Sequence, residues 1–215
     1  MAHRPHPSNP LALAVLALLF ERPMHPYEMG LVLRHRRKEE GIKFRYGSLY
    51  TVIDLLLARG FIAAGATGRD GRRPERTIYE ITAAGRDELQ AWMTALIGEP
   101  TKDYPLFETA LALLPVIPPD AALTLLRQRL AAIERNAAAL SAQIEEARER
   151  GLPPLFAVET EYRLALIKAE QQFVGDLIGR IEAGWGPLEV WRGLHADRDA
   201  TMSKLYREFG RALMR

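Results

Sequence analysis

Hydrophobic and polar positions alternate at helical spacing in the N-terminal part of the chain, with polar breaks between the segments. An apolar run from Leu11 to Phe20 follows Asn9 and Pro10, a pair typical of a helix start. A second helical segment begins near His25 and Pro26. The pattern therefore predicts two short helices in close succession.

A third segment, residues 46–59, carries its apolar residues on one face. Leu49, Val52, Ile53 and Leu56 follow the spacing i, i+3, i+4, i+7 of a half-buried helix. Hydroxyl-bearing residues at the start of the segment fall outside this stripe. We therefore expect an amphipathic helix whose polar N-terminal end faces solvent.

Two short β-type segments follow Gly60, at residues 61–64 and 77–81. They flank a charged loop that holds three glycines and four arginines. Strands this short must pack on helices to be stable. Thr82 can then cap a further helix that runs to about Ile97. Three helices, a hairpin and a helix in this order predict a winged helix-turn-helix.

The C-terminal half reads as helical throughout. Residues 106–114 form an apolar segment, and residues 120–150 carry apolar positions spaced by four and three, typical of a coiled-coil seam. A second long stripe runs from Tyr162 to Ile181, and a terminal helix is expected from about Asp197. The seam residues are Leu126, Leu130, Ile133, Ala137, Leu140, Ile144 and Ala147; the second stripe is Tyr162, Leu166, Ala169, Phe173, Leu177 and Ile181.

These patterns predict a mainly α protein with two domains. The winged helix-turn-helix covers residues 1–98, and a Gly-, Pro- and Asp-containing linker covers residues 99–105. A helical, coiled-coil-like dimerisation domain covers residues 106–215. Its apolar stripes either join two copies of the chain or pack within one helical hairpin.

Charge is divided unevenly between the two halves. Residues 1–98 hold 14 Lys and Arg against 10 Asp and Glu, whereas residues 99–215 hold 15 against 17. A basic N-terminal half indicates a polyanionic partner for that half, although the whole chain has a net charge of only +2.

Composition removes several classes of protein. The chain has no cysteine, which excludes disulfide frameworks, thiolate catalysis and zinc fingers, and suits a reducing cytoplasm. The longest apolar run, Leu11 to Phe20, is too short to span a bilayer, and Glu21, Arg22 and Pro23 follow it instead of a cleavage site. We expect a buried first helix, a cytoplasmic location and no membrane partner.

Catalysis is also not expected. The five histidines show no metal-binding spacing, and the sequence holds no glycine-rich phosphate loop or nucleophile elbow. We therefore predict no enzyme activity, no metal and no cofactor.

A winged helix-turn-helix in the basic half of the chain indicates DNA binding. The alternative is a winged-helix protein-interaction module that does not bind DNA.

Three short motifs give the chain a resemblance to a known family. They are His25-Pro26-Tyr27-Glu28, Tyr46-Gly47-Ser48-Leu49-Tyr50 and Thr77-Ile78-Tyr79-Glu80-Ile81-Thr82-Ala83-Ala84-Gly85. In this order and spacing, residues 11–85 resemble the PadR family of bacterial transcriptional regulators. Residues 106–184 are similar to the longer helical C-terminal domain of one branch of that family. Two positions differ from the family pattern: Arg45 and Tyr46 replace a Ser-Pro-type cap, and Thr51 replaces a frequent proline.

The resemblance implies a sequence-specific transcriptional regulator. It implies a homodimeric repressor that binds double-stranded DNA at a pseudo-palindromic operator and is released by a small hydrophobic or aromatic effector. Trp92 is the candidate effector contact, with interface core as its alternative.

The candidate DNA contacts cluster in two places. The helix-turn-helix supplies polar and basic residues, and the loop between the strands supplies arginines suited to a phosphate backbone or a minor groove. The alternatives are tyrosines packed under the wing and a loop that is merely solvated. The basic run from Arg34 to Lys38 fits either phosphate contact or its own helix C-terminus. The candidates are Tyr27, Lys43, Arg45, Tyr46, Ser48, Tyr50, Thr51, Arg69, Arg72, Arg73 and Arg76.

Overall fold

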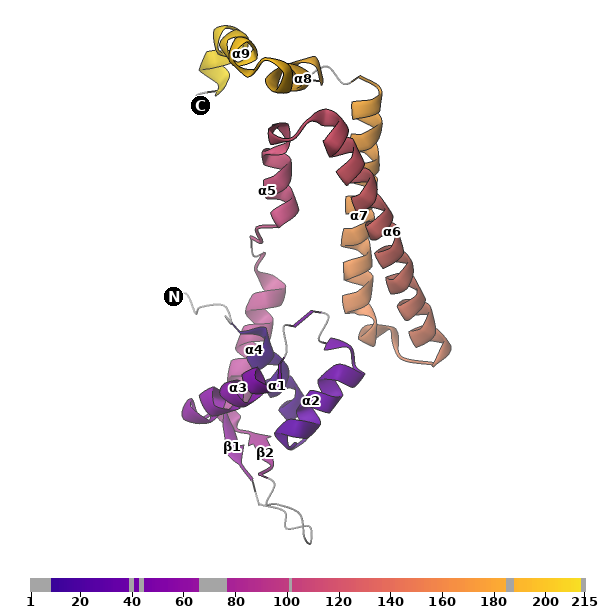
Figure 1. Cartoon of the computed structure of the whole chain (residues 1–215). Coiled ribbons are helices and arrows are strands. Elements are labelled where there is room, and N and C mark those ends of the chain that lie inside the picture. The colour runs from indigo at the N-terminus through magenta and orange to yellow at the C-terminus, as the bar shows by residue number, and fades with distance from the viewer. Residues whose placement is uncertain are drawn as a thin grey trace. The chain divides into compact units, whose positions relative to one another are not determined.

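The computed structural model describes residues 9–38, 41–42, 45–65, 77–100, 102–184 and 188–213. The chain divides into two compact units, Met1–Asp103 and Tyr104–Arg215. The first unit combines helices with one small sheet, and the second is helical over its described residues (Figure 1). The mainly α fold class expected from the sequence is confirmed.

The first unit has the element order of a winged helix-turn-helix. Its two strands pair antiparallel, with Ile62 opposite Ile81, and a bridge between Met24 and Tyr79 ties the segment before the second helix to the sheet. The elements are α1 (Pro10–Glu21), α2 (Pro26–His35), α3 (Tyr46–Ala58), β1 (Ile62–Ala64), β2 (Tyr79–Ile81) and α4 (Ala83–Gly98).

Side chains cap three of these helices where the sequence predicts a helix start. The Asn9 carboxamide oxygen accepts a hydrogen bond from the Leu11 N–H at 3.0 Å, and His25 Nδ1 accepts one from Tyr27 at 3.1 Å. Thr82 Oγ1 accepts one from the Gly85 N–H, also at 3.1 Å. Each bond satisfies a backbone donor that the helix leaves unpaired. By contrast, the N-cap residue of α3, Arg45, makes no side-chain cap hydrogen bond.

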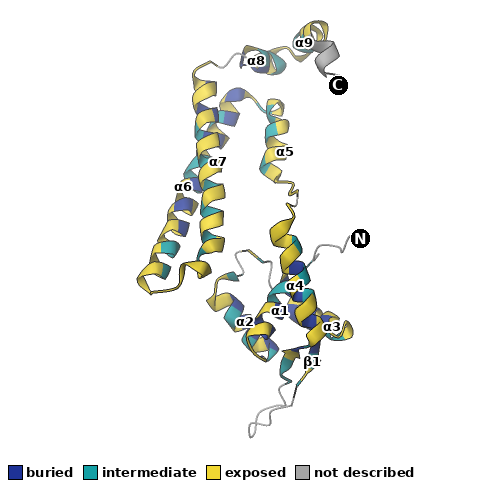
Figure 2. Ribbon diagram, turned by 180° about the vertical axis from the view of Figure 1, so that it is seen from behind, coloured by how far each residue is buried: buried dark blue, intermediate teal, exposed yellow. Residues whose placement is uncertain are grey.

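One hydrophobic core holds the first unit together. Leu16 of α1, Met29 of α2 and Leu49 of α3 are almost completely buried, and Ile62 and Ile81 extend the core into the sheet (Figure 2). The apolar stripe that the sequence predicts on α3 is entirely buried. Burial of this stripe determines which face of α3 points outward.

The second unit is built on a long helical hairpin. α6 and α7 run antiparallel, since Arg127 pairs with Glu182 while the later Arg129 pairs with the earlier Glu170. Around the hairpin lie shorter helices (Figure 1). The elements are α5 (Leu106–Ala112), the 3-10 helix η2 (Leu114–Val116), α6 (Pro119–Glu149), the 3-10 helix η3 (Pro154–Phe156), α7 (Val158–Glu182), α8 (Leu188–Ala196) and α9 (Arg198–Leu213).

The two sequence stripes of the hairpin meet different environments. On α6, the seam residues Leu126, Ile133, Ala137 and Leu140 are buried. On α7, Leu177 and Ile181 are buried, whereas the first four residues of the stripe are exposed. Successive steps of four residues rotate a stripe around a helix of 3.6 residues per turn, so one straight contact cannot cover all of it.

α8 precedes the terminal helix that the sequence predicts from about Asp197 and is not itself predicted. Its Trp191 is buried, and the indole N–H donates a hydrogen bond of 2.8 Å to the Ile117 carbonyl oxygen.

Among the described residues, no helix is both long and apolar enough to cross a membrane.

Candidate nucleic-acid interface

The polar end of α3 lies at the surface of the first unit. Ser48 and Thr51 are exposed, and 49% of the Tyr50 surface is accessible. The buried Leu49 and Val52 alternate with them and fix α3 against the core. The N-terminal half of α3 therefore presents a row of hydroxyl groups to solvent.

The hydroxyl groups differ in what they can still bind. Thr51 Oγ1 donates a hydrogen bond of 3.1 Å to the carbonyl oxygen of Gly47, one turn earlier in α3. Because this bond uses the hydroxyl proton, Thr51 can serve an outside partner chiefly as a hydrogen-bond acceptor. Ser48 and Tyr50 lie on the same exposed surface and can donate or accept.

Tyr46 joins α3 to α2 and is only half-exposed. Its ring stacks on Tyr27, with 6.2 Å between centroids and 13° between planes, and the Arg34 guanidinium lies 4.6 Å from its centroid. A Cβ at Gly30 would lie 2.6 Å from Tyr46 Cε1. Tyr46 thus packs on α2, while Tyr27 is 53% exposed beside it.

This packing could have been read from one feature of the sequence. Tyr27, Gly30 and Arg34 share a face of α2 at positions i, i+3 and i+7. A glycine between an aromatic and a cationic side chain leaves a hollow that accepts a ring. The sequence motifs give Tyr27 and Tyr46 as separate candidates, and the structure brings the two rings together.

The basic run at the end of α2 is largely engaged within the unit. Arg36 donates two hydrogen bonds to the Glu21 carboxylate, at 2.5 and 2.8 Å. This guanidinium holds the pKa of Glu21 below its usual value, and the carboxylate raises the pKa of Arg36. Arg22 and Glu28 form a second pair at 2.5 Å, which lowers the pKa of Glu28. These pairs link α1 to α2.

The remaining candidates fall into three groups. Arg45 is exposed at the N-cap position of α3. Trp92 is only 8% exposed and meets the Phe61 ring edge-on at 6.5 Å within the core of the first unit. Lys43 and the loop residues Arg69, Arg72, Arg73 and Arg76 lie outside the described residues.

No group of three or more His, Asp or Glu side chains suited to a metal ion occurs within the described part of the chain. The candidate site is therefore a surface of hydroxyl, aromatic and guanidinium groups on α2 and α3. Such groups suit phosphate oxygens and base edges.

Known proteins show the same fold. The crystal structure of Bacillus subtilis PadR in complex with operator DNA has a TM-score of 0.62 and 18% identity, over 81% of this chain and 99% of that chain. The same protein in complex with p-coumaric acid gives 0.64 and 15%, over 80% and 98%. The Vibrio cholerae virulence activator AphA gives 0.59 and 15%, over 80% and 98%.

The TM-scores show a shared fold at low sequence identity. No curated protein shows a significant match to the sequence. The model of the transcriptional regulator PadR-like family matches residues 15–91, the part of the chain that contains α2, α3, the hairpin and most of α4. The resemblance to PadR-like transcriptional regulators that the sequence motifs indicate is confirmed over these residues.

Proposed function

We propose that the protein is a sequence-specific DNA-binding regulator that inserts the N-terminal end of α3 into the major groove. The observation that carries this proposal is the outward row of hydroxyl groups at Ser48, Tyr50 and Thr51. A groove about 12 Å wide admits one α-helix, and the N-terminal residues of a recognition helix face the base edges.

The start of α3 supports the same orientation. Arg45, at the N-cap position, makes no side-chain hydrogen bond to the first turn of α3. The positive end of the helix dipole favours a phosphate there. Arg45 adds a full positive charge at this end. The crystal structure of the similar Bacillus subtilis PadR with operator DNA is consistent with this use of the fold.

In this proposal the loop residues Arg69, Arg72, Arg73 and Arg76, with Lys43, contact the phosphate backbone or an adjacent minor groove. Guanidinium groups are favoured in both places. Tyr27 and Tyr46 flank the groove contacts from α2 and the start of α3. Arg36 is assigned no DNA contact because Glu21 holds it.

We further propose a homodimer that acts as a repressor and is released by a small hydrophobic or aromatic effector. Two modules related by a two-fold axis match a pseudo-palindromic operator. The similar PadR bound to p-coumaric acid supports an effector, whereas the similar AphA is named an activator. The direction of regulation is therefore the first thing that a reporter assay should measure.

Binding to operator fragments selected from the genome of the source organism tests the proposal. Fluorescence anisotropy should give affinities that fall steeply with salt, because each neutralised phosphate releases counterions. Tyr50→Ala should weaken binding about tenfold or more, whereas Tyr162→Ala, an exposed tyrosine of the second unit, should not.

Arg72→Ala with Arg73→Ala should weaken binding to all sequences alike and reduce the salt slope. Failure to select any DNA, or affinity that is independent of salt, would contradict the proposal. That outcome would favour the protein-interaction module instead.

A further inference from the structure

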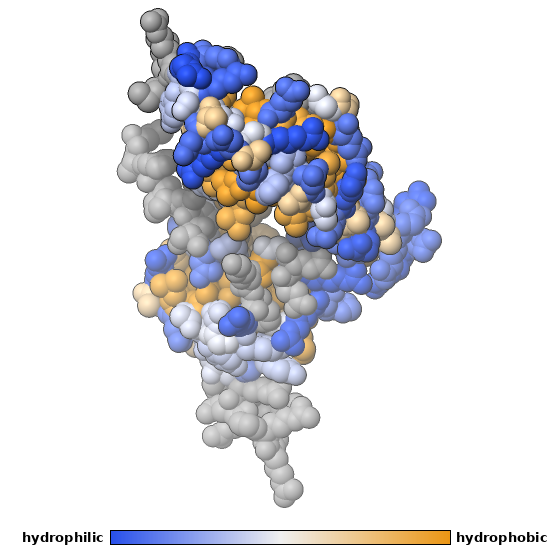
Figure 3. Space-filling model, turned by 45° about the horizontal axis from the view of Figure 1, so that its top comes forward, coloured by the Kyte–Doolittle hydropathy of each residue, from blue (hydrophilic) through white to orange (hydrophobic). Residues whose placement is uncertain are grey.

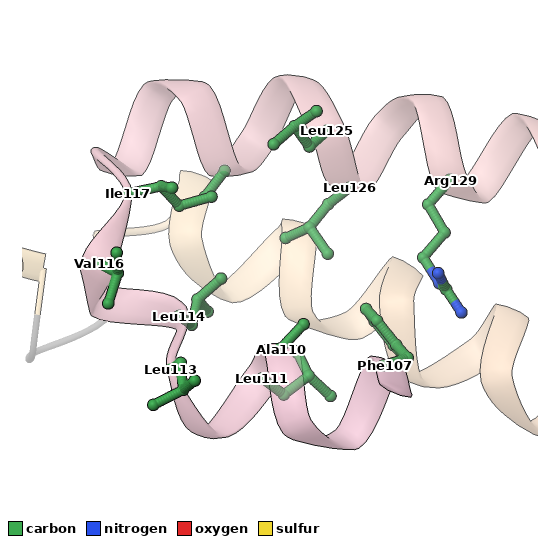
Figure 4. A pocket seen from close by; sticks show the side chains of 11 residues that line it. Phe107, Ala110, Leu111, Leu113, Leu114, Val116, Ile117, Leu125, Leu126 and Arg129 are labelled. Carbon is green, nitrogen blue, oxygen red and sulfur yellow. The ribbon is translucent and has the colours of Figure 1, made fainter. Parts of the chain in front are cut away.

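A cavity of about 410 Å³ lies within the second unit, between α5, η2 and the first turns of α6 (Figure 4). Leu111, Leu114, Ile117 and Leu126 form its apolar wall and point toward one another across the gap. Small-molecule sites in proteins commonly have volumes of about 300–1,000 Å³ and mostly apolar walls. The size and lining of this cavity suit a small ligand.

Arg129 is the one charged side chain among the described residues that line the cavity. Its guanidinium carbon lies 3.6 Å from the centroid of the Phe107 ring, and Figure 4 shows the group turned toward that ring at one end of the cavity. Arg129 Nε donates a hydrogen bond of 2.6 Å to Glu170 Oε1. The ring and the carboxylate together hold the guanidinium in place.

Glu170 takes up only part of the hydrogen-bonding capacity of this guanidinium. Nε and one terminal nitrogen of Arg129 both contact the same oxygen, Oε1. Since a guanidinium has five N–H donors, three have no protein acceptor in the described part of the chain. A half-buried, oriented guanidinium is the side chain best suited to bind a carboxylate.

We propose that this cavity binds a compact apolar molecule that carries one carboxylate. The apolar part lies between α5 and α6, and the carboxylate accepts hydrogen bonds from Arg129 beside Phe107. The assignment of this ligand as the effector rests on the proposed function, whereas the binding site itself does not.

The wall of the cavity also contacts α8 on its other side. Ile117 lines the cavity with its side chain, and its carbonyl oxygen accepts the hydrogen bond from the Trp191 indole. His195 Nε2 lies 2.9 Å from the carbonyl oxygen of Pro115, just after Leu114. A ligand that presses on Ile117 should therefore change the environment of Trp191, which gives an optical signal for occupancy.

Calorimetric titration of the full chain with 2-naphthoate and with the neutral 2-naphthalenemethanol tests the proposal. Both should bind the wild type, the acid more tightly. Arg129→Gln should weaken naphthoate binding about tenfold or more, because it removes a charged hydrogen-bond partner, and should leave binding of the alcohol within about twofold. Arg127→Gln is the matched control, since Arg127 pairs with Glu182 and does not line the cavity.

Ala110→Trp provides a second variant that does not depend on the charge. Ala110 is exposed on α5 and lines the cavity, so an indole there should block both probes. Naphthoate should also change the tryptophan fluorescence of the wild type, and Trp191→Phe should remove that change.

Several outcomes would overturn the proposal. These are no saturable binding of either probe, equal losses in Arg129→Gln and Arg127→Gln, or binding that survives Ala110→Trp. Conversion of Ala110→Trp to a monomer from a wild-type dimer would instead assign the cavity to a contact between copies. Because titration uses no DNA, loss of DNA binding alone would contradict the proposed function and leave the ligand site standing.

Discussion

Gly85 occupies the tightest backbone contact described in the first unit. A Cβ at this position would lie 2.0 Å from the carbonyl oxygen of Phe61 and 2.9 Å from Ile81 Cγ1. Real Cβ atoms do not approach a backbone oxygen so closely, so any side chain must push α4 away from the sheet. The glycine thus sets how closely the first turn of α4 approaches the segment that leads into β1.

We predict that Gly85→Ala lowers the free energy of unfolding by about 2–4 kcal/mol, because the added methyl group overpacks the contact with Phe61. Gly98→Ala, at the other end of α4, meets no atom within 4 Å and is the control. It should change stability by less than about 1 kcal/mol. Urea unfolding followed by circular dichroism measures both, and equal effects would contradict the packing argument.

The pair of Glu21 and Arg36 gives a prediction with a pH dependence. The hydrogen bond from Arg36 lowers the pKa of Glu21 from its usual 4.5. A carboxyl group whose pKa is lower in the folded state stabilises the fold above pH 4.5, and this contribution disappears as the pH falls through the lowered pKa. Both side chains are 45% exposed, so the effect is small.

Glu21→Gln should therefore reduce stability at neutral pH by less than about 1 kcal/mol. The difference from the wild type should shrink as the pH is lowered below 4.5. Arg36→Gln should show the same loss, and the double variant should show no further loss. A difference in unfolding free energy that grows as the pH falls would contradict a lowered pKa of Glu21.

At the scale of elements, the hydroxyl of Thr82 connects the end of α3 to the start of α4. It accepts the Gly85 N–H at 3.1 Å and donates to the carbonyl oxygen of Gly60 at 2.7 Å. Gly60 itself has φ +70°, a left-handed conformation that suits a glycine after a helix end. One side chain therefore satisfies two helix ends that are distant in sequence.

Thr82→Val keeps the shape of this side chain and removes both hydrogen bonds. We predict a loss of about 1–2 kcal/mol in unfolding free energy, the usual cost of losing an N-cap with an added partner. Thr82→Ser should retain most of the stability. Thermal unfolding of the three proteins compares them, and equal midpoints for the Val and Ser variants would exclude a contribution from the hydroxyl.

The helices of the second unit show that hydrophobic periodicity predicts a helix but does not determine which of its residues are buried. Four of the seven seam residues of α6 are buried, and the other three are partly buried. On α7, the exposed part of the stripe includes Tyr162 at 64%, Leu166 at 53% and Phe173 at 43%. A space-filling view likewise shows hydrophobic surface left uncovered among hydrophilic side chains (Figure 3). Spacing identifies the helix, whereas the neighbouring helix selects the face that it covers.

At the scale of the whole molecule, this uncovered face supports the proposed dimer. Contiguous exposed apolar side chains commonly mark contacts between proteins. In the proposed regulator, two copies would join through the face of α7 that holds Tyr162, Leu166 and Phe173 and so bring two recognition helices to one operator.

We predict that light scattering gives a mass of twice 24.2 kDa for the wild type and that Leu166→Glu shifts it toward 24.2 kDa, because a buried unpaired charge opposes association. Leu31→Glu, at an exposed leucine of α2, is the control and should leave the mass unchanged. A wild type that is monomeric at micromolar concentration would refute the dimer.

The sequence by itself determined most of the elements of this protein, with α8 as an exception. Local signals suffice for a capped helix at Asn9, a stop at Gly60 and the buried stripe of α3, because each depends on a few neighbouring residues. The family motifs likewise lie within single elements or their junctions, so the resemblance of residues 15–91 to the PadR-like family could be recognised before the structure.

Only the tertiary structure decided which groups meet across elements. The pairing of Arg36 with Glu21 and the hydrogen bond from Trp191 to Ile117 join residues whose separation in sequence carries no periodic signal. These contacts depend on how packed helices cross, which the burial of many apolar side chains determines collectively. The cavity beside Arg129 belongs to the same class, since it is a space that packing leaves between helices.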